Sequence, residues 1–405
     1  MENVNYKKLN RSINIYPIFY GLTADLIFWI AIDTLFLTSV KNLSASQINS
    51  IDAISTIVGI IFQIILVKIV RKIGNLNSVK LGVTLLFVSV LLNTISTNYI
   101  GFLIAELCYV IGFVFKHMDN VILIKNLKYL NRSEEYINYQ TKGSTIYSLI
   151  TLFISIISGF MFNINPYIPM IICLLVCFIN IILTNFIYEV PISFDESEVI
   201  ESNYTKNNFS KKIILMIILY GLFYAMIGCG QKNSKLFIQF DLQNLLKIDK
   251  VAIYMSAFIF ISRISRLLSN LLFLKIYNRY KEKMLYIFEF GLVLAFISLL
   301  IGHFIGSIYG VYIMALGFFM FLFIRDPFDN FMRKTLFENS SEKVHDKIVN
   351  YINLTRKIFT LIYSTIVASM LIKLNYVYVM SLLLILSISF IVIIYKVYRL
   401  VREKK

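Results

Sequence analysis

Long runs of apolar residues constrain this chain more than any other feature. Each is close to 20 residues or longer, and a helix of about 20 apolar residues crosses roughly 30 Å of hydrocarbon. Hydrophobic side chains make up 58% of the 405 residues, charged ones only 15%, and the mean hydropathy is +0.75, which excludes an ordinary soluble domain. We predict an all-α polytopic membrane protein with twelve transmembrane helices, at residues 13–40, 48–70, 79–97, 100–124, 143–163, 167–189, 212–238, 251–274, 284–303, 305–325, 350–372 and 375–397.

The first run is predicted to be a retained span, because it is too long for the core of a signal peptide and no small-residue cleavage site follows it. The sequence displays no metal-ligand spacing, catalytic triad or phosphate-binding loop. The four cysteines lie inside apolar runs and the three histidines are scattered. We therefore expect no enzyme activity, no ATP-driven transport, no metal site and no cofactor.

Basic residues are distributed unevenly between the predicted loops. Thirty Lys and Arg residues lie at the N-terminus, in the even-numbered loops and at the C-terminus. Six lie in the odd-numbered loops, namely Lys41, Lys232, Lys235, Lys247, Lys250 and Lys373. The positive-inside rule then places both termini in the cytoplasm. Because short basic loops at one membrane face account for the net charge of +16 and suit an anionic leaflet, we expect no nucleic-acid partner.

The two halves of the chain repeat short patterns in the same order. FYGL at 19–22 matches LYGL at 219–222, VKIVRKIG matches LKIYNRYK, and HMDNVIL matches PFDNFM at its Asp-Asn pair. Offsets near half the chain length predict two pseudo-symmetric six-helix bundles, the parallel-repeat arrangement of a transporter. The predicted domains are an N-terminal bundle at 1–190, a solvated cytoplasmic linker at 191–211 and a C-terminal bundle at 212–405.

Over essentially its whole length the chain resembles the major facilitator superfamily (MFS). In that family the loop between helices two and three reads G-x-x-x-D-R-x-G-R-[KR]. Here Gly74 matches the second glycine, while Lys72 stands at the arginine and Arg71 at the aspartate. In the second half, Asn278 and Arg279 stand at the Asp-Arg positions. The resemblance implies the two-bundle MFS fold and loops that latch helices together on the cytoplasmic side.

A second family motif, R-x-x-x-G-x-G, lies on helix four and is associated with proton-coupled antiporters. ELCYVIG at 106–112 places Gly112 at the later glycine and Glu106 at the arginine position. A carboxylate in mid-span can itself carry a proton. The alternative is a protonated, hydrogen-bonded structural glutamate.

Ionisable side chains inside spans are costly, roughly 2.5 to 3.5 kcal/mol on insertion scales, so they are the best candidates for a transport site. Asp25 and Asp33 on the first helix are eight residues apart, which is some 80° around a continuous helix and about 12 Å along it. Trp29, the only tryptophan, would stand between them and attract an organic cation. Alternatively, Trp29 packs or faces lipid, and one aspartate bonds a neighbouring helix.

The second half of the chain also has ionisable residues inside its predicted spans, an arginine pair and a glutamate. Arg263 and Arg266 share one face of helix eight and could hold an anionic substrate or pair with an interior carboxylate. Glu289, near the start of helix nine, is expected to snorkel towards the interface. The substrate and proton-pathway candidates are Asp25, Trp29, Asp33, Glu106, Arg263 and Arg266.

Charged clusters recur near the predicted cytoplasmic ends of helices four and ten, in FKHMDN and in its repeat FIRDPFDN. Such a symmetric pair is typical of a gate or latch rather than a substrate site. Together with the motif loops, the clusters give the predicted cytoplasmic gate residues Arg71, Lys72, Lys116, Asp119, Asn278, Arg279, Arg325, Asp326 and Asp329.

We expect a secondary active transporter of a small organic solute that works by alternating access in a bacterial plasma membrane. The acidic candidates indicate proton coupling and favour efflux of a cationic or amphipathic compound. The expected partners are the solute, protons and the lipid bilayer, and a monomer should suffice. Two alternatives stay open: a non-transporting protein of this fold, such as a sensor or assembly partner, and a lipid flippase.

Overall fold

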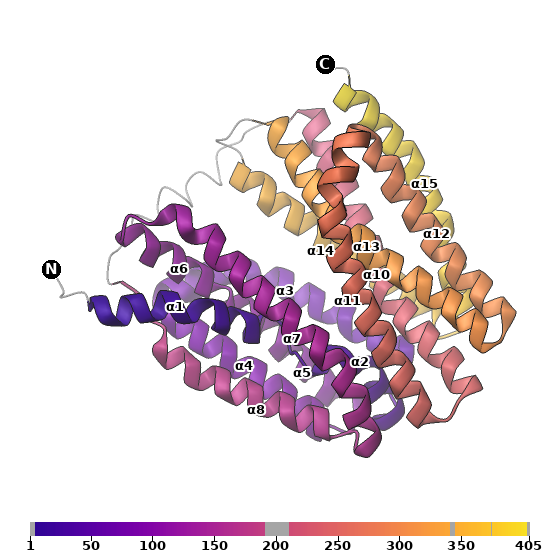
Figure 1. Ribbon diagram of the computed structural model, residues 1–405, viewed down its shortest axis with the longest axis horizontal. Helices are drawn as coiled ribbons and strands as arrows, with labels where there is room; N and C mark the ends of the chain where they lie inside the picture. Colours follow the sequence, from indigo (N-terminus) through magenta and orange to yellow (C-terminus); the bar gives the residue numbers. More distant parts are fainter. Residues whose placement is uncertain (1–4, 191–209, 341–344, 374, 403–405) are drawn as a thin grey trace. The chain divides into compact units, whose positions relative to one another are not determined.

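A computed structural model describes residues 5–190, 210–340, 345–373 and 375–402. All regular secondary structure in these residues is helical, as Figure 1 shows, so the predicted all-α class is confirmed. The chain forms two compact units. Unit 1 comprises Met1–Leu43 and Ile54–Glu196, and unit 2 comprises Ser44–Ala53 and Ser197–Lys405. The predicted linker at 191–211 lies, up to residue 209, outside the described residues.

Unit 1 is a bundle of long apolar helices joined by short turns. Within this unit, α1 packs against α7, and α4 packs against both α5 and α8. The elements of unit 1 are α1 (Tyr6–Thr23), α2 (Trp29–Leu35), the π-helical turn η1 (Phe36–Val40), most of α3 (Ala45–Ile73), α4 (Asn75–Ile95), α5 (Tyr99–Lys116), α6 (Met118–Tyr129), η2 (Ser133–Glu135), α7 (Tyr136–Ile164), α8 (Ile168–Leu183) and η3 (Thr184–Phe186).

Unit 2 has fewer breaks and longer helices. In it, α10 packs against α13 and α14, α11 packs against α13, and α12 packs against α13 and α15. The elements of unit 2 are the first turns of α3, then α10 (Lys211–Leu245), α11 (Ile248–Tyr280), η4 (Lys281–Lys283), α12 (Met284–Ile305), α13 (Ile308–Glu338), α14 (His345–Met370) and α15 (Tyr376–Arg402).

Ten helical segments among the described residues are long and apolar enough to cross a membrane. They support a multi-pass membrane protein without reproducing the predicted count of twelve. The predicted span 13–40 is divided between α1, α2 and η1, and only its second part, Trp29–Val40, is an apolar helix, which is shorter than a full span. The predicted span 350–372 falls on α14, which lacks a sufficiently apolar stretch.

Helix α10 extends well beyond the predicted span and ends at Leu245. Lys232 and Lys235 were counted as loop residues although the predicted span runs to 238; both lie inside this helix, and Lys235 is buried. The assignment was wrong because the polar run GQKNSK continues the helix instead of ending it. Removing two basic residues from the odd-numbered loops makes the predicted charge asymmetry larger.

The first turns of α3 belong to unit 2 because polar side chains bind them there. Asn49 donates to the side-chain oxygen of Asn233 at 3.1 Å, and Lys232 forms an ion pair with Asp52. The hydroxyl of Ser46 donates to the backbone oxygen of Ala368 at 2.8 Å. Helix α3 therefore begins in unit 2 and ends in unit 1.

Gly82 allows α4 to approach α5 closely at the turn that carries Lys116. A Cβ atom at Gly82 would lie 2.5 Å from the backbone nitrogen of Lys116 and 2.7 Å from the carbonyl oxygen of Gly112. Both neighbours are backbone atoms, so neither can turn aside. The contact fixes the position of the Lys116 turn inside unit 1.

Candidate functional site

The first predicted span is broken at Asp25. Helix α1 ends at Thr23 and α2 begins at Trp29, so Asp25 lies in a stretch without regular helix. Its Oδ1 accepts the backbone N–H of Leu26 at 2.8 Å, a local bond that competes with helical hydrogen bonding. The prediction that Asp25 and Asp33 lie on one continuous helix is therefore wrong, because the helix is interrupted between them.

Asp25 is held by a tyrosine from a neighbouring helix. The hydroxyl of Tyr109 on α5 donates to Asp25 Oδ1 at 2.9 Å. Glu106 lies one turn earlier on α5, and both carboxyl groups interact electrostatically with Tyr109, as does Tyr147 of α7. Asp25 and Glu106 are each half-buried. The structure thus brings together two carboxyl groups that the sequence placed on separate helices; we call Asp25, Glu106, Tyr109 and Tyr147 the carboxylate cluster.

Aromatic rings continue from the carboxylate cluster along α5. The ring of Tyr109 meets that of Phe113 edge to face, with centroids 4.7 Å apart. Phe113 in turn lies 6.0 Å from the imidazole of His117, where α5 gives way to α6. The predicted span 100–124 is therefore two helices, and the residue between them is His117.

Lys116 and Asp119 form a buried ion pair beside this junction. Lys116 Nζ lies 3.0 Å from Asp119 Oδ2, and each side chain is only 1% exposed. Lys116 Nζ also lies 4.7 Å from the ring centroid of Tyr20 on α1, a cation–π contact. The two predicted gate residues are thus paired with each other inside unit 1.

A hydrogen-bond network surrounds the ion pair. The hydroxyl of Tyr16 lies 2.6 Å from Asn120 Oδ1 and 2.8 Å from Gln140 Oε1. The rings of Tyr16 and Tyr20 are 5.9 Å apart. This network joins α1, α6 and α7 at the second half of α1, and it lies on the same side of α1 as the Lys116 contact.

Trp29 and Asp33 take local partners in α2 and η1. The indole of Trp29 packs edge to face against Phe36, at 6.1 Å between centroids. Phe36 continues to Tyr167 at 5.5 Å, and Lys41 Nζ lies within 5.4 Å of both rings. Asp33 Oδ1 accepts the backbone N–H of Thr34 at 2.6 Å. Trp29 thus belongs to an aromatic cluster at the end of unit 1 opposite the ion pair.

Unit 2 carries its own polar row on α10 and α13. The guanidinium of Arg325 donates from Nε to the hydroxyl of Tyr224 and from Nη1 to Gln231 Oε1, each at 3.1 Å. Asp329 accepts from Tyr220 and, at 2.7 Å, from Arg333 Nε. Tyr220 of unit 2 therefore bonds the repeat motif of its own unit, as Tyr16 does in unit 1.

Arg266 and Asp326, predicted in different groups, form one ion pair. Arg266 donates from Nε to Asp326 Oδ2 at 2.6 Å and from Nη2 to Oδ1 at 3.1 Å, a two-pronged contact. Asn270 adds a third donor at 3.1 Å. Of the two interpretations of Arg266, the geometry matches pairing with an interior carboxylate. Arg263, one turn earlier on α11, is half-buried.

Glu289 is buried and does not snorkel as predicted. Its side chain is 4% exposed, and neither carboxyl oxygen has a hydrogen-bond partner among the described residues. The prediction failed because Glu289 follows the start of α12 by more than one turn, which places it inside the helical packing of unit 2.

The motif-loop residues lie at helix ends. Lys72 is exposed in the last turn of α3. Asn278 and Arg279 are exposed near the end of α11, where the Arg279 guanidinium lies 5.6 Å from the ring of Tyr280. Arg71 lies in α3, and its side chain is outside the described part of the chain.

Several residues of these networks were not predicted. Tyr109 bonds the candidate Asp25 and Gln231 bonds the candidate Arg325, while Gln140 bonds Tyr16 beside the ion pair. One signal was present for Gln231, which opens the polar run in the predicted seventh span. Tyr109 gave no such signal, because tyrosine is common in membrane helices for packing alone.

No protein-family profile matches the sequence, and no curated protein matches it. Solved structures do. The nucleoside transporter NupG matches with a TM-score of 0.73 and 13% identity, over 98% of this chain and 100% of that chain. A bacterial homologue of the iron transporter ferroportin, in an inward-facing state, matches with a TM-score of 0.69 and 14% identity, over 98% of this chain and 100% of that chain. A bacterial metal transporter matches with a TM-score of 0.68 and 13% identity, over 96% of this chain and 98% of that chain. The chain therefore has the fold of these membrane transporters, the MFS fold that its sequence motifs resemble.

Proposed function

We propose that this protein is a secondary transporter that moves a small organic solute across the bacterial plasma membrane by alternating access. The observation that carries the proposal is the helix break at Asp25. Irregular backbone at membrane depth is tolerated where it is buried in protein or lines a water-filled cavity, and transporters use such breaks to bind substrate and coupling ions. Asp25 adds a carboxylate to the break, and Tyr109 orients it.

Proton coupling is the proposed energy source. The hydroxyl of Tyr109 bonds Asp25 and interacts electrostatically with Glu106. Two carboxylates near each other repel, and a proton on one of them relieves that repulsion. A proton shared within the carboxylate cluster and a cationic solute would then compete for the same negative charge. This competition is a direct basis for exchange of protons against an exported cation.

The solute proposed is organic and carries a positive charge or an amphipathic ring. Tyr109 and Phe113 place aromatic faces beside the carboxylate, which suits an organic cation. The fold neighbours transport different things, since their names specify nucleosides, iron and metal. They support transport as the activity and leave the substrate class to the residues of this chain.

We further propose that both termini face the cytoplasm, following the basic loops, and that the Lys116 network forms the inner gate. In that orientation the buried Lys116–Asp119 pair lies in the cytoplasmic half of unit 1, inside the helical packing. A gate residue acts on the rate of opening rather than on the solute. Asp119→Asn should therefore change the transport rate more than the affinity for a ligand.

A ligand screen on the purified protein tests the site. Thermal stabilisation is measured across a library of amines, nucleosides, other organic cations and anions, for the parent, for Asp25→Asn and for Asp249→Asn. Asp249 is an exposed aspartate in the first turn of α11. Asp249→Asn therefore removes the same charge as Asp25→Asn, but away from the site. We expect at least one cationic ligand whose stabilisation is lost in Asp25→Asn and kept in Asp249→Asn. A set of ligands that all stabilise Asp25→Asn as much as the parent would remove Asp25 from the site.

A further inference from the structure

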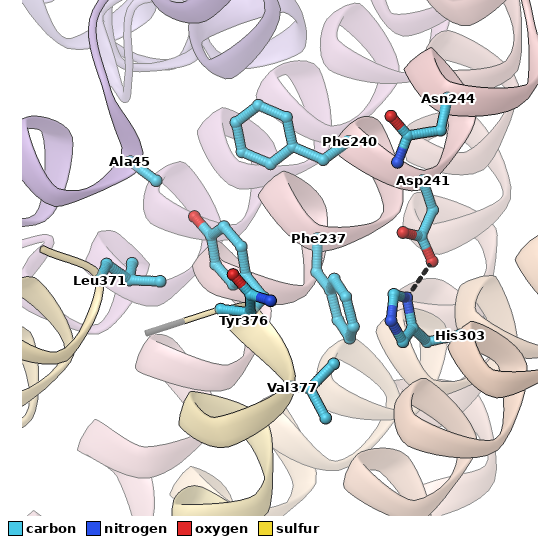
Figure 2. A pocket seen from close by; sticks show the side chains of 10 residues that line it. Ala45, Phe237, Phe240, Asp241, Asn244, His303, Leu371, Tyr376 and Val377 are labelled. Carbon is cyan, nitrogen blue, oxygen red and sulfur yellow. Dashed lines mark hydrogen bonds and ion pairs between the residues drawn. The ribbon is translucent and has the colours of Figure 1, made fainter. Parts of the chain in front are cut away.

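A cavity lies wholly within unit 2, at the end where α10 and α12 finish and α15 begins. Its volume is about 340 Å³, and its lining includes Phe237, Phe240, Asp241, His303 and Tyr376. Figure 2 shows Asp241 and His303 on one side of the cavity and Tyr376 with Leu371 on the other, with Phe237 between them. None of these residues belongs to the carboxylate cluster or to the predicted gate.

One wall of the cavity is a continuous row of rings. Phe240 and Tyr376 have centroids 5.8 Å apart, and Tyr376 stacks on Phe237 at 5.6 Å with an angle of 15° between the planes. Phe237 then meets the imidazole of His303 at 4.8 Å. The faces of such rings carry negative electrostatic potential, which attracts cations.

A carboxylate lies at the His303 end of this row of rings. Asp241 Oδ2 lies 2.7 Å from His303 Nδ1, and the Asp241 side chain is only 14% exposed. Figure 2 shows the second oxygen of Asp241 turned away from His303. Among the described residues no Lys or Arg lines the cavity, and the imidazole of His303 is already engaged by Asp241. An anionic ligand would therefore meet the Asp241 carboxylate without a free basic side chain to offset it.

The polar groups of the cavity suit an organic cation better than a metal ion. The described residues hold no cluster of three or more His, Cys, Asp or Glu side chains, and Asp241 and His303 alone leave a metal ion short of protein ligands. The hydroxyl of Tyr376 is buried without a hydrogen-bond partner among the described residues. A buried unpaired hydroxyl is costly, and a polar group of a ligand or a water molecule would satisfy it.

We propose that this cavity binds a small aromatic ammonium compound, with its ammonium group on Asp241 and its ring against Phe237, Phe240 and Tyr376. In the orientation proposed above, the cavity lies towards the outside of the cell. It is a second binding site, distinct from the carboxylate cluster of unit 1. His303 positions the carboxylate by holding one of its oxygens, which leaves the other for the ligand.

Calorimetric titration of the full-length protein in lipid nanodiscs tests this site. The probes are 2-phenylethylamine and the uncharged 2-phenylethanol, which is nearly the same size. Charge-assisted hydrogen bonds and cation–π contacts together predict that the amine binds the parent at least about tenfold more tightly than the alcohol. Asp241→Asn should abolish that preference, and Asp249→Asn should keep it.

Two further variants keep the test decisive. Phe240→Leu retains the charge and removes one ring, and it should weaken amine binding about threefold to tenfold; it replaces Asp241→Asn as the main test if that variant does not fold. Asp25→Asn separates the two sites. The proposal is overturned if the parent does not bind the amine, if amine and alcohol bind equally, or if Asp25→Asn abolishes amine binding while Asp241→Asn leaves it intact. The last result would retain the proposed transport site in unit 1.

Discussion

The buried pair of Lys116 and Asp119 gives the sharpest test of the packing in unit 1. At 3.0 Å between charged atoms, with each side chain 1% exposed, the attraction is about 5 to 6 kcal/mol for an effective dielectric constant of about 20. Desolvation costs several kcal/mol for each ion, so the net contribution of the intact pair is small. Removing one partner leaves the other charge buried alone, and Asp119→Asn should therefore cost about 3 to 5 kcal/mol.

The double replacement Lys116→Met with Asp119→Leu removes both charges. It should be no less stable than the parent, and gains of about 1 to 4 kcal/mol are known for such replacements. An exposed pair provides the control. Lys334 and Glu338 lie 3.7 Å apart and are 47% and 59% exposed, so Glu338→Gln should cost less than about 1 kcal/mol.

The assay is thermal unfolding in detergent, followed with a dye that fluoresces on reacting with thiols. Three of the four free cysteines are buried, so they react as the protein unfolds. With roughly 2 to 4 °C per kcal/mol for a unit of this size, Asp119→Asn should lower the midpoint by on the order of 10 °C. A loss similar to that of Glu338→Gln, or a double variant as unstable as the single one, would refute the reasoning.

Three other changes have definite expected results in the same unfolding assay. Gly82→Ala should cost roughly 1 to 3 kcal/mol, because its Cβ would lie 2.5 Å from the backbone of Lys116; an unchanged midpoint would mean that α4 and α5 separate freely. Glu289→Leu should raise stability by about 1 to 3 kcal/mol, because it replaces a buried carboxyl group that has no hydrogen-bond partner among the described residues by a side chain of similar volume. A lower midpoint would show that the carboxyl group is satisfied. Asp326→Asn should destabilise more than Arg266→Met with Asp326→Leu together, since the double change leaves no unpaired charge; equal losses would argue against a coupled pair.

The membrane class and most spans could be predicted because they depend on composition along single stretches of chain. A helix needs about 20 apolar residues to cross the bilayer, whichever helices it packs against. Lys232 and Lys235 were counted as loop residues, because a polar run such as that around Gln231 looks like a loop unless its partners are known. Here Arg325 and the first turns of α3 supply those partners.

The breaks and the pairings could not be predicted in the same way. The break at Asp25 contains neither glycine nor proline, so the usual signals of a helix end are absent. Arg266 and Asp326 lie 60 residues apart in sequence, and only the packing of α11 against α13 brings them together. The Asp241 cavity depends likewise on α10, α12 and α15 meeting at one end of unit 2.

Transport in proteoliposomes is the measurement that tests the central claim most directly. A cationic ligand identified by the stabilisation screen is loaded as a radiolabelled solute, and its movement against an imposed pH gradient is followed for the parent, Asp25→Asn, Tyr109→Phe and Tyr309→Phe. Tyr309 is 75% exposed and controls for loss of a tyrosine hydroxyl. We predict gradient-driven transport by the parent and Tyr309→Phe, none by Asp25→Asn, and a rate reduced about tenfold in Tyr109→Phe, which loses a hydrogen bond to a charged group. Movement of the solute at the parental rate by Asp25→Asn, or no movement by the parent under any gradient, would contradict the account.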